Sequence, residues 1–129
     1  MILLDENLPR GQQRLLERWG IRARQIGYDI SYRGIQDEEI LPLLHRLNLP
    51  SLFTRDLGLY RRRNCHPNYC IICIDASEEQ APSFVRRVLR HRRLNTHRKR
   101  VGKIIRVTDS GIKCWHAGDS IEHDISWGK

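Results

Sequence analysis

The chain has 129 residues and a formal net charge of +8, with 23 Lys and Arg against 15 Asp and Glu. This length suits one core, so we expect residues 1–129 to form a single domain. The apolar fraction of 40% is typical of a folded protein, and the longest apolar run, Cys70–Ile74, is too short to span a bilayer. No basic stretch leads into an apolar segment at the start, so we expect a cytoplasmic protein that does not contact a membrane.

The net charge comes entirely from the second half of the chain. Residues 1–60 hold 8 basic and 8 acidic side chains, whereas residues 61–129 hold 15 basic and 7 acidic ones. Of the 23 basic residues, 19 are arginines, whose planar guanidinium suits phosphate and carboxylate groups. This asymmetry predicts a polyanionic partner, with RNA or DNA first and an acidic protein second.

In chain order, short apolar runs predict buried strands, and apolar residues at a spacing of three or four predict helices. The strands are expected at Ile2–Leu4, Ile21–Ile26, Ser51–Thr54 and Cys70–Ile74. The helices are expected from Pro9 to Gly20, from about Asp37 to Leu47, and from Ala81 into a basic segment. Asn7 is the expected cap of the first helix, whereas Pro42 fits the second only if it lies in the first turn.

Strands that alternate with helices indicate an α/β protein with a mainly parallel central sheet. Near the end of the chain, Lys103–Thr108 and Ile112–His116 flank the turn Asp109-Ser110-Gly111 and predict a C-terminal β-hairpin. In open α/β sheets, ligands bind outside the carboxyl ends of the strands. The residues that follow the strands are therefore the first candidates for a functional site.

Acidic residues follow three of the predicted strands. Asp5, Asp56 and Asp75 each end a strand, and Asp37 begins a helix at the same edge of the sheet, with Glu38 and Glu39 next to it. Carboxylates that are close together repel one another unless a cation neutralises them, and oxygen ligands favour Mg²⁺ or Mn²⁺ over zinc. A structural role is the alternative for Asp37 as a cap, for Glu38 and Glu39 at the helix dipole, and for Asp75 in a turn.

Three segments together resemble a known family. MILLDENLP, GIQDEEIL and LFTRD, in this order and spacing, resemble the PIN-like proteins related to VapC toxins. The resemblance implies a three-layer α/β/α fold, Mg²⁺- or Mn²⁺-dependent endoribonuclease activity, and the role of toxin in a toxin–antitoxin pair. The implied partners are RNA and a small antitoxin protein, and a homodimer stays open.

The resemblance also assigns residues. It places Asp5, Asp37 and Asp56 among the metal-site acids. Glu38 is a further catalytic candidate, Asp75 a positional candidate for the fourth acid, and the supporting residues are Asn7, Glu39, Thr54 and Arg55. Relatives often continue the third motif with another Asp and then Phe, whereas Asp56 is followed here by Leu57. This weaker acid set leaves room for a protein that keeps the fold but cleaves slowly or not at all.

Two basic segments are the candidate RNA-binding surfaces. Arg86, Arg90 and Arg93 recur at helical spacing and predict one positively charged helix face, which His97 continues. The second segment is Arg61, Arg62 and Arg63, in the connection after Asp56. The alternatives for the helix face are a solvated surface and a docking surface for an acidic partner chain.

Two other functions compete with the nuclease. A non-catalytic module for binding RNA or protein would combine an incomplete acid set with the basic surface. A receiver-like phospho-acceptor domain would use the acidic pair after the first strand together with Asp56. Against the receiver, no Lys-Pro pair follows a fifth strand.

Overall fold

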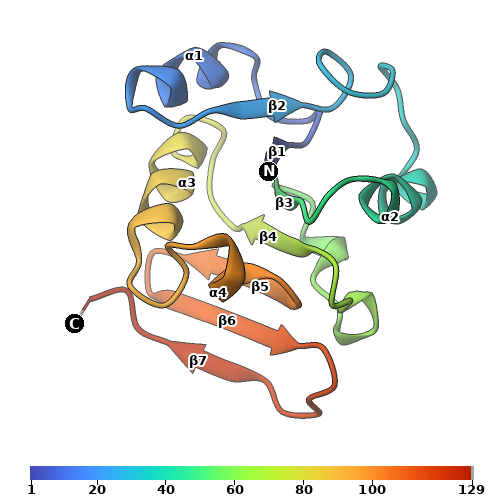
Figure 1. Cartoon of the computed structure of the whole chain (residues 1–129). Helices are drawn as coiled ribbons and strands as arrows, with labels where there is room; N and C mark the ends of the chain where they lie inside the picture. Colours follow the sequence, from blue (N-terminus) through green and yellow to red (C-terminus); the bar gives the residue numbers. More distant parts are fainter. Residues whose placement is uncertain (129) are drawn as a thin grey trace.

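A seven-stranded mixed sheet forms the centre of the molecule (Figure 1). The structure is a computed structural model and describes residues 1–128. The strand order is β2-β1-β3-β4-β5-β6-β7; the first five strands are parallel to one another, and β6 and β7 are antiparallel to their neighbours. The strands are β1 (Ile2–Leu4), β2 (Ala23–Gln25), β3 (Ser51–Thr54), β4 (Cys70–Ile74), β5 (Lys103–Thr108), β6 (Gly111–His116) and β7 (His123–Ile125).

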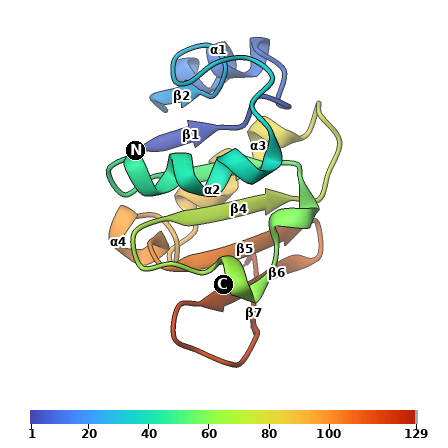
Figure 2. The same ribbon diagram turned by 90° about the vertical axis from the view of Figure 1, so that its right-hand side faces the viewer.

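Helices cover both faces of this sheet, so the predicted α/β class with helical layers on either side of the strands is confirmed. The helices are α1 (Gly11–Arg18), α2 (Asp37–Arg46), α3 (Ala81–Arg90) and α4 (His97–Arg100), with 3₁₀ turns η1 (Leu57–Leu59) and η2 (Arg62–Asn64). Helices α1 and α3 bury Leu16, Phe84 and Val88 in one cluster with Phe53 and Ile72. Figure 2 shows α2 on the opposite face from α3.

Helix α2 packs against its face of the sheet with a separate apolar cluster. The main members of this cluster lie on α2 or on the side of the strands turned toward it, and they include Leu3, Ile40, Leu44, Leu52 and Ile71. The strand side chains alternate between the two clusters, as the two-residue period of a strand requires. None of the helices within residues 1–128 combines the length and the apolar character that crossing a membrane requires.

The expected bounds of β1, β3, β4 and β5 are confirmed, but the first helix begins later than predicted. Helix α1 starts at Gly11, and its capping position is Arg10 rather than Asn7. Residues 5–8 form a turn instead, in which the amide of Leu8 donates to the carbonyl of Asp5 at 3.2 Å. Pro42 lies at the sixth position of α2, beyond the first turn, where its ring is exposed to solvent.

The prediction of a single basic helix face is wrong. Helix α3 ends at Arg90, and His91 bends the chain by accepting from the amide of Arg93 through Nδ1 and bonding the carbonyl of Ser126 through Nε2. A separate short helix, α4, begins after Thr96, whose hydroxyl accepts from the amide of Lys99. Arg93 and His97 therefore do not continue the face of α3. The sequence also predicted only a terminal hairpin, whereas the structure adds the short strand β7 to it.

Candidate active site

The chain reverses its direction of winding at β1, and this creates a crevice. After β1 the chain passes through α1 to β2 on one side, and it then crosses through α2 to β3 on the other side. Such a reversal is where open α/β sheets bind ligands, outside the carboxyl ends of the strands. A cavity of about 450 Å³ lies there, lined by Asp5, Glu6, Asn7, Ile35, Asp37, Ile40 and Asp56.

Asp5 is the buried member of this acidic cavity. Its side chain follows β1 and is only 8% exposed. One carboxylate oxygen accepts from the amide of Glu6 at 2.7 Å, and the other accepts from the hydroxyl of Thr54 at 2.6 Å. Burial raises the pKa of Asp5 above its ordinary value of 3.8; the two hydrogen bonds oppose this shift, and the negative charges of Asp56 and Asp37 add to it. Asp5 is thus fixed in place, and its hydrogen bonds come from neutral donors only.

This raised pKa makes the metal-free protein sensitive to pH. The folded state favours the protonated form of Asp5, so its stabilising contribution is present below the unfolded pKa and is lost as pH rises through the folded one. In EDTA, we expect Asp5→Asn to be more stable than the wild type at neutral pH and equally stable near pH 3. Urea unfolding at both pH values measures this difference. Glu38→Gln, on an exposed side chain, controls for the change in net charge, and equal stabilisation by both variants would contradict the prediction.

Asp56 is joined to Asp5 through Thr54. The Thr54 hydroxyl donates to Asp5 and accepts from the amide of Asp56 at 3.0 Å. One Asp56 oxygen accepts from the amide of Gly58 at 2.9 Å and so caps η1. Residues 57–59, which follow Asp56, therefore form a turn that holds this carboxylate. Asp37 is the first residue of α2 and lies exposed at the rim of the cavity.

The predicted supporting residue Asn7 also lines the cavity, whereas the remaining predicted acids, Glu38, Glu39 and Asp75, do not. Glu38 is exposed on the first turn of α2. The carboxylate of Glu39 accepts from the amide of its capping partner Gln36 and from the hydroxyl of Tyr32. Asp75 forms an ion pair of 2.7 Å with Arg106 of β5. The structure therefore brings together Asp5, Asp37 and Asp56 and leaves Glu38, Glu39 and Asp75 outside.

Arg55 points away from the cavity toward the connection between β4 and α3. Its Nε donates to the carbonyl of Ala76 at 3.0 Å, and its guanidinium lies 3.7 Å from the carboxylate of Glu78. Arg55 therefore links the ends of two neighbouring strands. Its charge is directed at this loop rather than at the carboxylates of Asp5 and Asp56.

Two further residues shape the cavity: Gln25, which the sequence did not single out, and Glu6, which was considered only as part of the acidic pair of the phospho-acceptor alternative. Gln25 of β2 is fully buried, and its side-chain amide donates to the carbonyls of Leu8 at 2.7 Å and Asp5 at 3.2 Å. Glu6 accepts from the amide of Gly34 at 2.9 Å and thereby holds the loop that leads into α2. Gly27 has a φ of +88°, and a Cβ there would lie 2.7 Å from Glu6. For Glu6, the available signal in the sequence was its place directly after Asp5, together with the later loop that contains Gly27 and Gly34.

The predicted RNA-binding arginines are divided between the two faces of the sheet. Arg86 lies over the ring of Trp19, with its guanidinium carbon 4.6 Å from the ring centroid. Both line a cavity of about 590 Å³, which also includes Arg90 and Trp127. This basic surface belongs to α3, on the face opposite α2 (Figure 1). The exposed segment Arg61–Arg63 instead follows η1, on the chain that leaves Asp56.

The cavity offers only oxygen donors for a cation. Within the described residues, no group of three or more His, Cys, Asp or Glu side chains is already arranged to hold a metal ion. The Asp5 and Asp56 oxygens that accept hydrogen bonds keep further lone pairs, and the carboxylate of Asp37 lies exposed at the rim. Four carboxylates line the cavity, those of Asp5, Glu6, Asp37 and Asp56, and the first has a raised pKa; such a set fits a hard divalent ion such as Mg²⁺ or Mn²⁺.

The crevice at the reversal point of this sheet is lined mainly by acidic side chains. A crevice at a reversal point is a general feature of open sheets and does not select a reaction. The carboxylates in this crevice favour reactions that a bound cation assists. No family model, no curated protein and no solved structure matches this chain.

Proposed function

We propose that this protein is a Mg²⁺- or Mn²⁺-dependent endoribonuclease of PIN-like fold, acting as the toxin of a toxin–antitoxin pair. The observation that carries the nuclease proposal is the convergence of Asp5, Asp37 and Asp56 on one cavity. These acids come from three separate segments of the chain, and each follows a strand or begins a helix at the same edge. Such an acid cluster at a ligand-binding crevice suits cation-assisted hydrolysis of a phosphodiester.

The side chains of the cavity have different roles in this proposal. Asp5, fixed by the Thr54 hydroxyl, and Asp56, fixed by the amide of Gly58, would hold the cation from the floor of the cavity. Asp37 would complete the set from the rim. When bound, the cation supplies activation of water and stabilisation of the charge that develops on the phosphate. Ile35 and Ile40 form the apolar part of the wall.

Metal removal tests the proposal directly. RNA cleavage should stop in EDTA and return with Mn²⁺, and calorimetric titration should show one Mn²⁺ site that is lost in Asp56→Asn. Mn²⁺ should also raise the melting temperature of the wild type, because a ligand that binds only the folded state stabilises it. Cleavage that continues unchanged in EDTA would contradict the mechanism.

A second candidate is a binding module without catalysis, and the surface of α3 favours it. Three arginines (Arg86, Arg87 and Arg90) lie with Trp19 and Trp127 on the face opposite the acidic cavity. This basic surface shares no residue with the acidic cavity, so an acidic partner protein such as an antitoxin could bind it without a metal ion. This candidate predicts partner binding that is unchanged in EDTA and in Asp56→Asn, together with no Mn²⁺ heat in the titration.

The phospho-acceptor alternative shares one feature with the structure. The order β2-β1-β3-β4-β5 is that of flavodoxin-like folds, and Asp5 and Asp56 flank its reversal point. However, β5 ends at Thr108 and is followed by Asp109, without the basic residue of a receiver. Incubation with a small phosphodonor should therefore leave the intact mass of the protein unchanged.

A further inference from the structure

A row of polar side chains runs across the sheet from the acidic cavity to the antiparallel strands. Thr54, which bonds Asp5, is paired with Cys73 of β4, and Cys73 is paired with Arg106 of β5. Arg106 is in turn paired with Lys113 of β6. Because neighbouring strands lie about 4.8 Å apart, the backbone of Arg106 is roughly 15 Å from that of Asp5. The side chains of this row share the face of the sheet that α2 covers.

Cys73 lies between the acidic cavity and Arg106, and the charges on both sides shift the pKa of its thiol. Burial raises the pKa of Cys73 to about 12; the charges of Asp56 and Asp5 add to the shift, and Arg106 opposes it. The negative cavity and the positive side chain of β5 are thus electrostatic neighbours. Thr54 and Cys73 are fully buried, so a polyanion would pass over the residues that cover them and would meet the positive charge of Arg106 one strand beyond Cys73.

Arg106 keeps hydrogen-bond donors for such a ligand. One terminal nitrogen of its guanidinium donates to Asp75 at 2.7 Å, and the other terminal nitrogen has no partner among the described residues. Its Nε also lacks a partner, but it is buried and does not reach a ligand on the surface. A guanidinium has five N–H donors in a planar fork that suits phosphate. The ion pair is open to solvent, since the side chains of Arg106 and Asp75 are 40% and 39% exposed.

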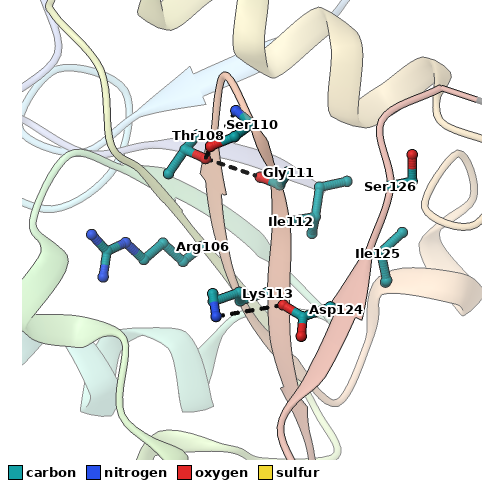
Figure 3. Close-up of a pocket in the computed structure, with 9 residues that line it drawn as sticks. All are labelled: Arg106, Thr108, Ser110, Gly111, Ile112, Lys113, Asp124, Ile125 and Ser126. Atoms are coloured by element: carbon teal, nitrogen blue, oxygen red, sulfur yellow. Dashed lines mark hydrogen bonds and ion pairs between the residues drawn. The ribbon is translucent and has the colours of Figure 1, made fainter.

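A second cavity continues from Arg106 over the antiparallel strands (Figure 3). It has a volume of about 630 Å³, and Arg106, Lys113, Thr108 and Ser110 supply its cationic and hydroxyl groups. Lys113 lies 3.5 Å from Asp124 of β7, a pair that is also exposed. With the hydroxyl of Ser126, this cavity has two cationic and three hydroxyl side chains, and it also includes the carboxylate of Asp124. These cations form a surface for the phosphates of a strand that extends across the sheet from the acidic cavity.

We propose that Arg106 and Lys113 bind RNA phosphates beyond the one held over the acidic cavity, and that Asp75 pairs with Arg106 instead of holding metal. This inference rests on the proposed nuclease function for its choice of RNA as ligand. It gives the substrate a direction, from β1 and β3 across β4 toward β5 and β6. The basic surface of α3, on the other face of the sheet, has no part in holding the cleaved strand.

The chain provides a matched pair of arginines for the test. Arg87 of α3 has a side chain that is 40% exposed, as that of Arg106 is, and it also faces a carboxylate, Asp109, at 3.9 Å. Fluorescence anisotropy in EDTA, with the full chain and a labelled single-stranded RNA, measures binding apart from cleavage. Arg106→Gln should weaken binding about tenfold and lower the salt slope of log K by about 0.7, because the variant neutralises one phosphate fewer. Arg87→Gln should bind as the wild type does.

Two further variants keep the proposal testable if Arg106→Gln folds poorly. Arg106→Lys keeps the charge and should restore part of the affinity. Asp75→Asn releases Arg106 from its carboxylate and should tighten RNA binding while Mn²⁺ binding, measured by calorimetry, stays unchanged. Loss of the Mn²⁺ site in Asp75→Asn would overturn its assignment as the partner of Arg106 and return it to the metal ligands.

The outcomes separate this inference from the proposed function. If the wild type cleaves RNA and Arg106→Gln binds and cleaves equally well, the phosphate surface is wrong and the nuclease stands. If no Mn²⁺-dependent cleavage occurs but Arg106→Gln weakens RNA binding, the surface stands and the nuclease is wrong. If Arg87→Gln weakens RNA binding and Arg106→Gln does not, RNA lies on the face of α3 and the inference is overturned.

Discussion

Asp5→Asn should lower Mn²⁺-dependent RNA cleavage by roughly a thousandfold or more, because it removes the buried carboxylate from the proposed metal site. The substitution keeps the shape of the side chain, and it relieves the burial of a charge whose pKa the surroundings raise. The variant should therefore fold normally and lose the Mn²⁺-induced rise in melting temperature. Initial rates of cleavage at saturating Mn²⁺, with melting curves of the same samples, measure both effects.

Glu38→Gln is the matched control for this loss. Glu38 is next to Asp37 in the sequence, carries the same charge as Asp5, and lies outside the cavity on an exposed turn. We expect it to cleave within about twofold of the wild type, since exposed substitutions away from a site have small effects. A large loss in Glu38→Gln with full activity in Asp5→Asn would place the reaction elsewhere on the chain.

Gln25→Glu should destabilise the protein by about 2–4 kcal/mol at neutral pH, because two buried carbonyls lose their donor and a carboxylate replaces it. The side-chain amide of Gln25 bonds the carbonyls of Asp5 and Leu8, and the residue has no exposed surface. The new carboxyl can donate only when it is protonated, so the loss should shrink toward low pH. Urea unfolding at neutral and acidic pH measures both effects.

The neighbouring Arg24 supplies the control for the Gln25 variant. Arg24 lies on the same strand with its side chain exposed, so Arg24→Gln should change the free energy of unfolding by less than about 0.5 kcal/mol. Gln25→Leu removes the donor without adding a charge and should lose stability at every pH. Equal stability of Gln25→Glu and the wild type at neutral pH would show that this buried amide does not hold the turn after β1.

The sequence could predict the acidic cavity because its members have local signals. Asp5 and Asp56 each stand after a short buried strand, and Asp37 begins a helix that starts at the same edge. Parallel strands bring such residues together without any knowledge of side-chain contacts. Asp75 satisfies the same local rule, yet it pairs with Arg106, because that contact is set by the register of β4 against β5.

The basic segment shows why spacing alone was insufficient. Arg86, Arg90 and Arg93 recur with the period of a helix, but the chain turns at His91 and buries Leu94. Thr96, a good helix-capping residue, was a sign that a new helix begins there. The role of Gln25 could not have been predicted from the sequence either. Its hydrogen bonds to the carbonyls of Asp5 and Leu8 depend on the turn of residues 5–8, which lies where the first helix was expected to begin.

The topology of the sheet also affects the order in which the protein folds. The hairpin of β5 and β6 joins strands that are separated by only Asp109 and Ser110, so its contacts are local. Pairing of β1 with β3 joins Ile2 to Ser51, far apart in the chain, and contacts of this kind form slowly. During refolding, pulse-labelled hydrogen exchange should therefore show protection of the amides of the hairpin before those of β1. Until β1 pairs with β3, a refolding chain carries Asp5, Asp37 and Asp56 without the cavity that they line, so any ion or ligand that needs all three binds only after this late step.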